Sequence, residues 1–254
     1  MTKINIGPQS FEVEMIICDK DGTLTNFNIM WGNWIKNWID QLVMKTGEAH
    51  DLDLAALTDN LDKTLGFRRE STSVVPESPV AVSTVSKIGT AAMVVLYQAG
   101  IDWHSAEELV GHVASQPVEM TSEMVQPVGD VKQAFSDWSA AGIKIIVATS
   151  DDRDPTLQAV RLMGIEHLIT EYYCGDDPVA NKPNPEAIHR LSKDHDISPS
   201  RMLMVGDAVS DMAFGRNGQV AGCIGISGGS GDQAALDTAA DIVISSVDEM
   251  KVDS

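Results

Sequence analysis

Two aspartates near the start of the chain could carry out phosphoryl chemistry. Asp19 and Asp21 stand in the sequence DKDGT at residues 19–23, directly after the apolar run at residues 15–18. In such a pair, one carboxylate can attack phosphorus and the other can exchange protons with the leaving group and with water. An Asp-Gly turn without catalytic function explains this fragment equally well when it is taken alone.

Two further segments offer groups that could hold a phosphate. Thr149 and Ser150 follow the apolar run at residues 145–148. A hydroxyl at the tip of a buried strand, followed by backbone amides that enter a turn, can bind phosphoryl oxygens, although such residues also cap helices. Lys182 precedes a proline at the start of a predicted helix, where it could neutralise an aspartate nucleophile and the phosphoryl group. The alternative for Lys182 is a solvated surface lysine.

A second acidic pair follows another apolar run. Asp207 comes after residues 202–206, and Asp211 lies one helical turn further on. Bringing these carboxylates next to Asp19 and Asp21 costs on the order of several kcal/mol per close pair at an effective dielectric constant of about 20. A divalent cation removes that cost, and oxygen ligands beside a phosphate favour Mg2+.

The apolar runs predict the elements that position these side chains. We expect strands at the following residues: 15–18, 145–148, 202–205, 220–226 and 242–244. Helical patterns lie between them, at residues 128–141, 155–163 and 184–194. Continuous apolar runs that alternate with helices are typical of a doubly wound α/β fold with a parallel sheet. In such a sheet, ligands bind at the carboxyl ends of the strands, where the candidate residues stand.

A helical insert interrupts this alternation. We expect helices at residues 30–46, 51–65, 78–98 and 105–115. The sequence therefore predicts a core domain made of residues 1–27 and 125–254, with a smaller, all-helical cap domain at residues 28–124. Arg68 and Arg69 are the paired basic residues of this insert, and they could contact a second anionic group of a substrate. A solvated arginine pair is the alternative.

The composition limits the partners. A net charge of -19 and a pI near 4.5 disfavour binding to nucleic acid or to an anionic membrane. Three widely separated cysteines form no disulfide framework, and no apolar leader or membrane-length run is present, so we expect a cytoplasmic protein. The glycine-rich stretch at residues 225–231 lacks the spacing of a phosphate-binding motif and predicts a flexible turn near the rim of the site.

Taken together, these motifs resemble the haloacid dehalogenase superfamily, in its phosphatase branch of the phosphoglycolate phosphatase and β-phosphoglucomutase type. The resemblance rests on DKDGT at residues 19–23, a strand that ends at Thr149, Lys182 before proline, and GDAVSD at residues 206–211. It implies that a small phosphorylated metabolite is the substrate and that Asp19 becomes phosphorylated. It also implies that Asp21 protonates the leaving oxygen and later activates water.

The resemblance implies further roles. Thr149 would hold the phosphoryl oxygens, and Lys182 would neutralise the nucleophile and the transferring group. Mg2+ would be held by the side chains of Asp19 and Asp207 and by the backbone carbonyl of Asp21, with Asp211 as a further ligand or as outer support. Because family members that cleave carbon–halogen or carbon–phosphorus bonds lack the acid at the position of Asp21, the resemblance favours hydrolysis of a phosphate ester.

Other functions stay open at this point. A phosphosugar mutase of the same family would use the same residues. A receiver-like or other binding protein without hydrolytic activity is the alternative from another class, although receivers lack a large helical insert after the first strand.

Overall fold

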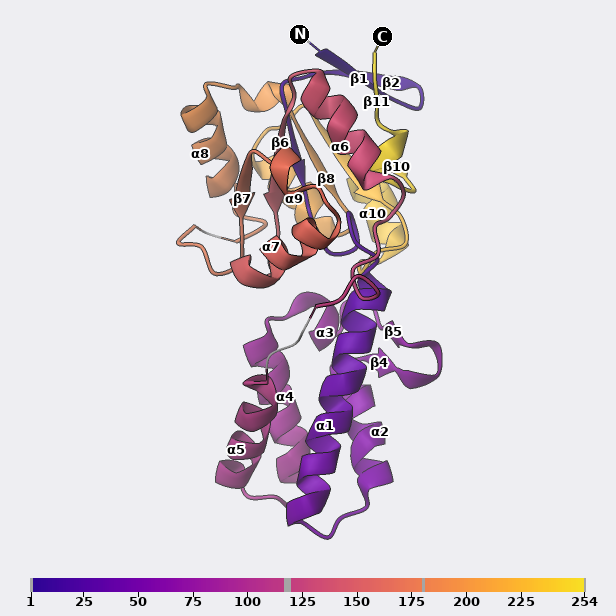
Figure 1. Ribbon diagram of the computed structural model, residues 1–254, viewed down its shortest axis with the longest axis vertical. Helices are drawn as coiled ribbons and strands as arrows, with labels where there is room; N and C mark the ends of the chain where they lie inside the picture. The colour runs from indigo at the N-terminus through magenta and orange to yellow at the C-terminus, as the bar shows by residue number, and fades with distance from the viewer. Residues whose placement is uncertain (1, 117–119, 180, 254) are drawn as a thin grey trace. The chain divides into compact units, whose positions relative to one another are not determined.

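The computed structural model describes residues 2–116, 120–179 and 181–253. The chain divides into two compact units (Figure 1). One consists of Met1–Phe27 with Met120–Ser254, and the other is Asn28–Glu119. The second segment of the first unit thus begins at Met120, whereas the sequence analysis predicts that it begins at residue 125.

A six-stranded parallel sheet forms the centre of the first unit. In spatial order its strands are β10 (Ile242–Ile244), β9 (Gly222–Ile226), β8 (Met202–Gly206), β3 (Met15–Cys18), β6 (Lys144–Ala148) and β7 (Glu171–Tyr173). The predicted doubly wound sheet is confirmed, and five of its strands lie where the apolar runs predict them. The edge strand β7 was missed, because Glu171–Tyr173 is short, half-buried and not an apolar run.

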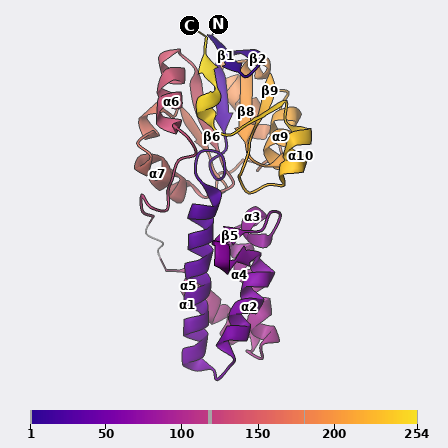
Figure 2. The ribbon, with the colours of Figure 1, turned by 90° about the vertical axis from the view of Figure 1, so that its right-hand side faces the viewer.

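Helices cover both faces of this sheet, which explains why its strands are apolar on both sides. They are α6 (Val131–Ala140), α7 (Arg153–Leu162), α8 (Glu186–His195), α9 (Val209–Asn217) and α10 (Gln233–Ala239). Figure 2 shows α6 and α7 on one side of the strands, and α9 and α10 on the other. Met15 and Ile17 of β3 pack in one buried cluster with Ile188 of α8, Phe214 of α9 and Leu236 of α10. The buried core therefore fixes β3 in the middle of the unit.

A small antiparallel sheet adds to the first unit and was not predicted. Its spatial order is β11 (Lys251–Val252), β1 (Thr2–Ile6) and β2 (Gln9–Val13). The sequence feature that indicates this strand is the alternation of apolar and polar residues in β1, where Ile4 and Ile6 are fully buried while Lys3 is exposed. Gly7 adopts a positive φ in the turn to β2, a conformation that glycine adopts without strain.

The second unit is built of helices, as predicted. They are a π-helical turn (Asn28–Gly32), α1 (Asn33–Ala49), α2 (Leu54–Leu65), α3 (Pro79–Val82), α4 (Val85–Gln98) and α5 (Trp103–Ala114). Trp31, Trp34 and Trp38 pack against one another with ring centroids 5.2 and 6.2 Å apart, so their spacing marks a packing face. Among the described residues, no helix combines the length and the apolar character that crossing a membrane requires.

One short β-ladder departs from the all-helical expectation for this unit. The strands β4 (Phe67–Arg68) and β5 (Ser73–Val74) pair antiparallel around a 3-10 turn (Arg69–Ser71). Gly66 ends α2 in the left-handed conformation, which redirects the chain into β4. Two-residue strands leave no periodic pattern, and the sequence analysis therefore did not predict them.

Candidate active site

The register of three central strands brings the candidate residues to one edge of the sheet. Cys18 of β3 is paired with Val147 of β6 and with Val205 of β8. Asp19 leaves the end of β3 directly beside these strands, and its N–H donates to the carbonyl of Val205 at 2.8 Å. Asp207 and Thr149, which directly follow β8 and β6, therefore emerge next to Asp19.

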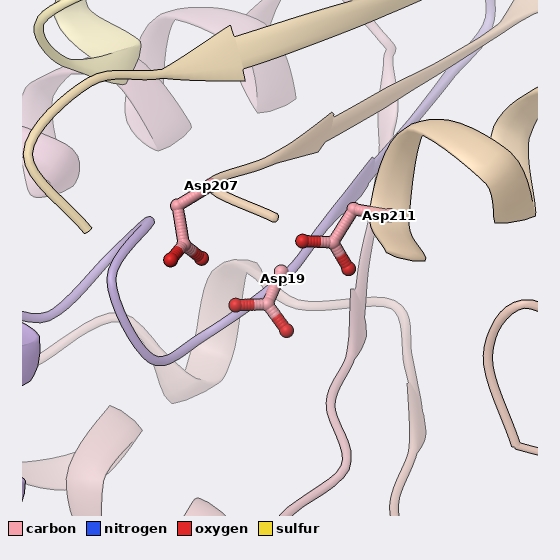
Figure 3. A group of neighbouring side chains, drawn as sticks. All are labelled: Asp19, Asp207 and Asp211. Carbon is pink, nitrogen blue, oxygen red and sulfur yellow. The ribbon is translucent and has the colours of Figure 1, made fainter. Parts of the chain in front are cut away.

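Three buried aspartates gather at this edge (Figure 3). Asp19, Asp207 and Asp211 each offer a carboxylate oxygen within 4.8 Å of the other two, and their exposed fractions are 7%, 3% and 2%. Asp211 comes from the first turn of α9, where its Oδ2 also accepts the N–H of Ala208 at 3.1 Å. We refer to these three residues as the acidic triad.

Lys182 inserts its ammonium group into the acidic triad. Its Nζ lies 2.5 Å from Oδ1 of Asp19 and 2.6 Å from Oδ1 of Asp211. Burial raises the pKa of Asp19 well above the usual 3.8, and the Asp211 and Asp207 carboxylates add to the rise, while Lys182 opposes it. Burial lowers the pKa of Lys182, but Asp19 and Asp211 outweigh that effect and raise it overall.

The charges of this group suit a divalent cation. Three carboxylates and one ammonium give −3 + 1, a formal charge of −2, in a buried place. The donor set consists of carboxylate oxygens, which hard cations such as Mg2+ prefer. The residues present therefore fit a Mg2+ site.

Asp207 is held by three donors from two loops. Thr23 donates through Oγ1 to Oδ1 at 3.2 Å, while Ser230 donates to Oδ2 through both its N–H (2.6 Å) and its Oγ (2.8 Å). Burial and the neighbouring Asp211 raise the pKa of Asp207 to about 6, although the bonds from Ser230 oppose the shift.

Ser230 belongs to the glycine-rich stretch that the sequence analysis interpreted as a flexible turn. The structure places this stretch beside the site, where it contacts Asp207, and a Cβ atom at Gly229 would overlap the Asp207 carboxylate. β9 is the neighbour of β8 in the sheet, which brings the loop after β9 to the end of β8, and the sequence alone does not show this strand order.

The Asp21 side chain points to different partners. Its Oδ1 is bound by Lys20 Nζ at 2.5 Å and by Thr25 Oγ1 at 3.2 Å. Lys20 has no exposed side-chain surface and also pairs with Asp151 Oδ2 at 3.0 Å. The acidic triad therefore does not include the Asp21 carboxylate. The sequence analysis missed Lys20 and Asp151, although a lysine between two aspartates at the end of an apolar strand is an unusual residue.

Thr149 and Lys182 line one pocket, together with Tyr173 and Phe214. Thr149 is buried, and its Oγ1 accepts the N–H of Asp151 at 3.1 Å, which leaves its hydroxyl proton for another acceptor. Ser150 is exposed. The structure thus places Thr149 and Lys182 at one pocket.

The two arginines of the pair lie in the second unit and differ in their surroundings. Arg69 makes a two-point ion pair with Asp62, at 2.7 and 2.9 Å, and contacts Asp40 at 2.6 Å. These bonds connect α1, α2 and the turn after β4, which gives Arg69 a structural role within the unit. Arg68 is exposed, and only Arg68 stays a candidate for binding an anionic group.

Comparison with known proteins identifies the family. A family model described as haloacid dehalogenase-like hydrolase matches residues 13–219. The chain therefore belongs to the haloacid dehalogenase-like hydrolases.

Individual relatives match parts of the chain. A phosphoglycolate phosphatase of Vibrio vulnificus is 28% identical over 124 residues, which is 46% of this chain and 53% of that protein. A pyrophosphatase PpaX of Bacillus velezensis is 25% identical over 118 residues, 46% of this chain and 55% of that protein. The match thus spans about half the length of these curated relatives.

Solved structures share the whole fold. A predicted phosphoglycolate phosphatase from Haemophilus somnus superposes with a TM-score of 0.65 at 18% identity, covering 93% of this chain and 95% of that one. A β-phosphoglucomutase from Clostridium difficile gives a TM-score of 0.55 at 17% identity and covers 94% and 93%. At these identities, the likeness shows the fold alone.

Proposed function

We propose that this protein hydrolyses a phosphate monoester of a small molecule through a phosphorylated Asp19. One observation carries the proposal: Asp19 is buried at the carboxyl end of the central strand, in contact with Lys182 and within the acidic triad. A buried carboxylate beside an ammonium group and other carboxylates is poised for phosphoryl transfer, in which catalysis consists mostly of positioning and charge stabilisation.

The chemistry divides into two steps. In the first, an Asp19 carboxylate oxygen forms a bond to phosphorus while the bond to the leaving oxygen breaks, and Asp21 gives that oxygen its proton. In the second, Asp21 takes a proton from water, whose oxygen attacks phosphorus, so that inorganic phosphate leaves and Asp19 is regenerated. Thr149 and Lys182, which line one pocket, would hold the phosphoryl oxygens during both steps.

The acidic triad would hold Mg2+ through the Asp19, Asp207 and Asp211 side chains, together with the backbone carbonyl of Asp21. A bound Mg2+ supplies charge neutralisation for the phosphoryl oxygens. Thr23 and Ser230 would keep the Asp207 carboxylate in place, because partners that orient a ligand support metal affinity.

For the substrate, we propose a small anionic phosphate, in keeping with relatives named phosphoglycolate phosphatase and pyrophosphatase. Residues 28–124, with the exposed Arg68, would act as the cap that selects it. The reaction would take place in the cytoplasm, in keeping with three cysteines that are all free. A panel of phosphoglycolate, pyrophosphate and sugar phosphates would identify the preferred ester, and product analysis would separate hydrolysis from phosphate transfer within a sugar.

The test is hydrolysis of p-nitrophenyl phosphate with Mg2+, with EDTA, and by the Asp19→Asn variant. We expect Mg2+-dependent turnover that EDTA and Asp19→Asn both abolish, and wild-type protein that carries one hydroxylamine-sensitive phosphoryl group during turnover. Asp59→Asn makes the same chemical change at an exposed residue paired with Lys63 and should retain activity. Turnover that survives both EDTA and Asp19→Asn would refute the assignment of the site.

A further inference from the structure

Lys20 is the most deeply buried charged residue near the candidate site, and the two-step reaction assigns it no role. Its side chain has no exposed surface, and its Nζ lies 2.5 Å from Asp21 Oδ1 and 3.0 Å from Asp151 Oδ2. A lysine is almost never fully buried unless it is paired, because removing an ammonium group from water costs several kcal/mol. A buried ammonium group, whose desolvation is unfavourable, therefore lies next to the proposed general acid.

The contacts of Asp21 show what this charge does. Both donors found for its carboxylate in the described part of the chain, Lys20 and Thr25, bind the same oxygen, Oδ1. Two donors on one oxygen fix the rotation of the carboxylate, and they leave Oδ2 as the oxygen that can carry a proton. A freely rotating carboxylate would present either oxygen to the reacting group.

Asp151 anchors the other side of the ammonium group. Its Oδ1 accepts the N–H of Asp152 at 2.9 Å, while its Oδ2 faces Lys20. The loop after β6 thus holds Lys20, and Lys20 in turn holds the loop after β3. The bridge Asp151–Lys20–Asp21 therefore connects the loops that follow two neighbouring strands, β6 and β3.

We propose that Lys20 is a positioning residue that orients Asp21 so that its Oδ2 delivers the proton to the leaving oxygen. This inference rests on the proposed hydrolysis through Asp19. If Lys20 orients Asp21, its loss should lower the rate for esters whose leaving group needs a proton and should have little effect on the others. A residue that only stabilised the fold would affect all esters alike.

The test compares kcat/KM for two aryl esters of similar shape. Phenyl phosphate releases a strongly basic phenolate and needs the proton, whereas p-nitrophenyl phosphate releases a weakly basic one. Because kcat/KM reports the steps up to the first phosphoryl transfer, the later reaction with water does not enter the comparison. General-acid catalysis contributes about 100- to 10,000-fold, and misplacing the acid should forfeit part of it.

For Lys20→Met, we expect kcat/KM to fall at least about tenfold more for phenyl phosphate than for p-nitrophenyl phosphate. The matched control is Lys63→Met, which makes the same change at an exposed lysine paired with Asp59, so that the ratio between the two esters should stay near the wild-type value. Circular dichroism establishes that each variant is folded.

Lys20→Met leaves two carboxylates without their cation and could fail to fold. The double variant Lys20→Met/Asp151→Asn removes one charge of each sign, and comparing it with Asp151→Asn gives the same test. Equal losses for both esters in a folded Lys20 variant would overturn the inference. Wild-type protein that hydrolyses neither ester would overturn the proposed function itself and the inference with it.

Discussion

Replacing Lys182 by methionine should greatly lower turnover and, at the same time, tighten the binding of Mg2+. Lys182 Nζ is in contact with Oδ1 of both Asp19 and Asp211, at 2.5 and 2.6 Å. The ammonium group therefore competes for the oxygens that the proposed Mg2+ site uses. Methionine keeps most of the side-chain volume and removes the charge.

The size of the effect follows from these distances. A Mg2+–oxygen bond of about 2.1 Å, added to the contact between ammonium and carboxylate, puts the two cations within about 5 Å of each other. At that distance their repulsion is about 1.7 kcal/mol at the dielectric constant of water, and larger in a buried site. Because about 1.4 kcal/mol corresponds to a factor of ten, the dissociation constant for Mg2+ should fall at least about tenfold. Loss of the charge that offsets the nucleophile should lower kcat about 1,000-fold.

Calorimetric titration with Mg2+ in alkaline buffer, where the carboxylates are ionised, measures the affinity. Hydrolysis of p-nitrophenyl phosphate measures the rate. Lys45→Met is the matched control, since Lys45 is partly exposed and pairs with Glu48 in the second unit. Breaking a buried ion pair costs about 3–5 kcal/mol, so thermal unfolding must show that the Lys182 variant is folded. A folded variant that binds Mg2+ with unchanged or lower affinity would refute the proposed place of the ion.

Two further outcomes test the surroundings of Asp207. Ser230→Ala removes the Oγ bond and keeps the N–H bond, so calorimetry should show a loss in Mg2+ affinity of about tenfold; unchanged affinity would contradict the role of the glycine-rich stretch. With EDTA present, the raised pKa of Asp207, about 6 against 3.8, means that the folded protein keeps a proton which the unfolded chain loses. The stability of the folded protein should therefore fall as the pH rises from about 4 to 6, by on the order of 2 kcal/mol. Thermal unfolding against pH should show a smaller fall in stability for Asp207→Asn than for the wild type. The same fall in both would refute the assignment of this pH dependence to Asp207.

The positions of the strand ends could be predicted from the sequence. An apolar run that ends at an aspartate or threonine indicates both that the strand is buried and where it ends. Parallel pairing then requires Asp19, Asp207 and Thr149 to emerge at one edge. The helical insert was equally visible, because its segments carry no strand pattern.

The contacts between loops could not be predicted. Lys20 lies within the DKDGT motif, yet its partner Asp151 is distant in sequence, and only the folded loops bring the two together. Ser230 likewise looks like one more small residue in a glycine-rich stretch, and its role depends on β9 lying beside β8. Arg69 illustrates the same limit, because the sequence does not show that its side chain pairs with Asp62 and Asp40.

The order of the strands has a consequence for biosynthesis. The central strand β3 is the first strand of the large sheet to leave the ribosome, but its neighbours β6 and β8 follow only after the whole helical unit has been made. Until then, Asp19 has neither Asp207 nor Lys182 beside it, and the apolar faces of β3 have nothing to cover them. The helical unit is one continuous stretch of the chain, Asn28–Glu119, so all of its residues have been made before β6 and β8. The nascent chain thus completes the proposed site almost at the end of translation, when the stretch that carries Ser230 emerges.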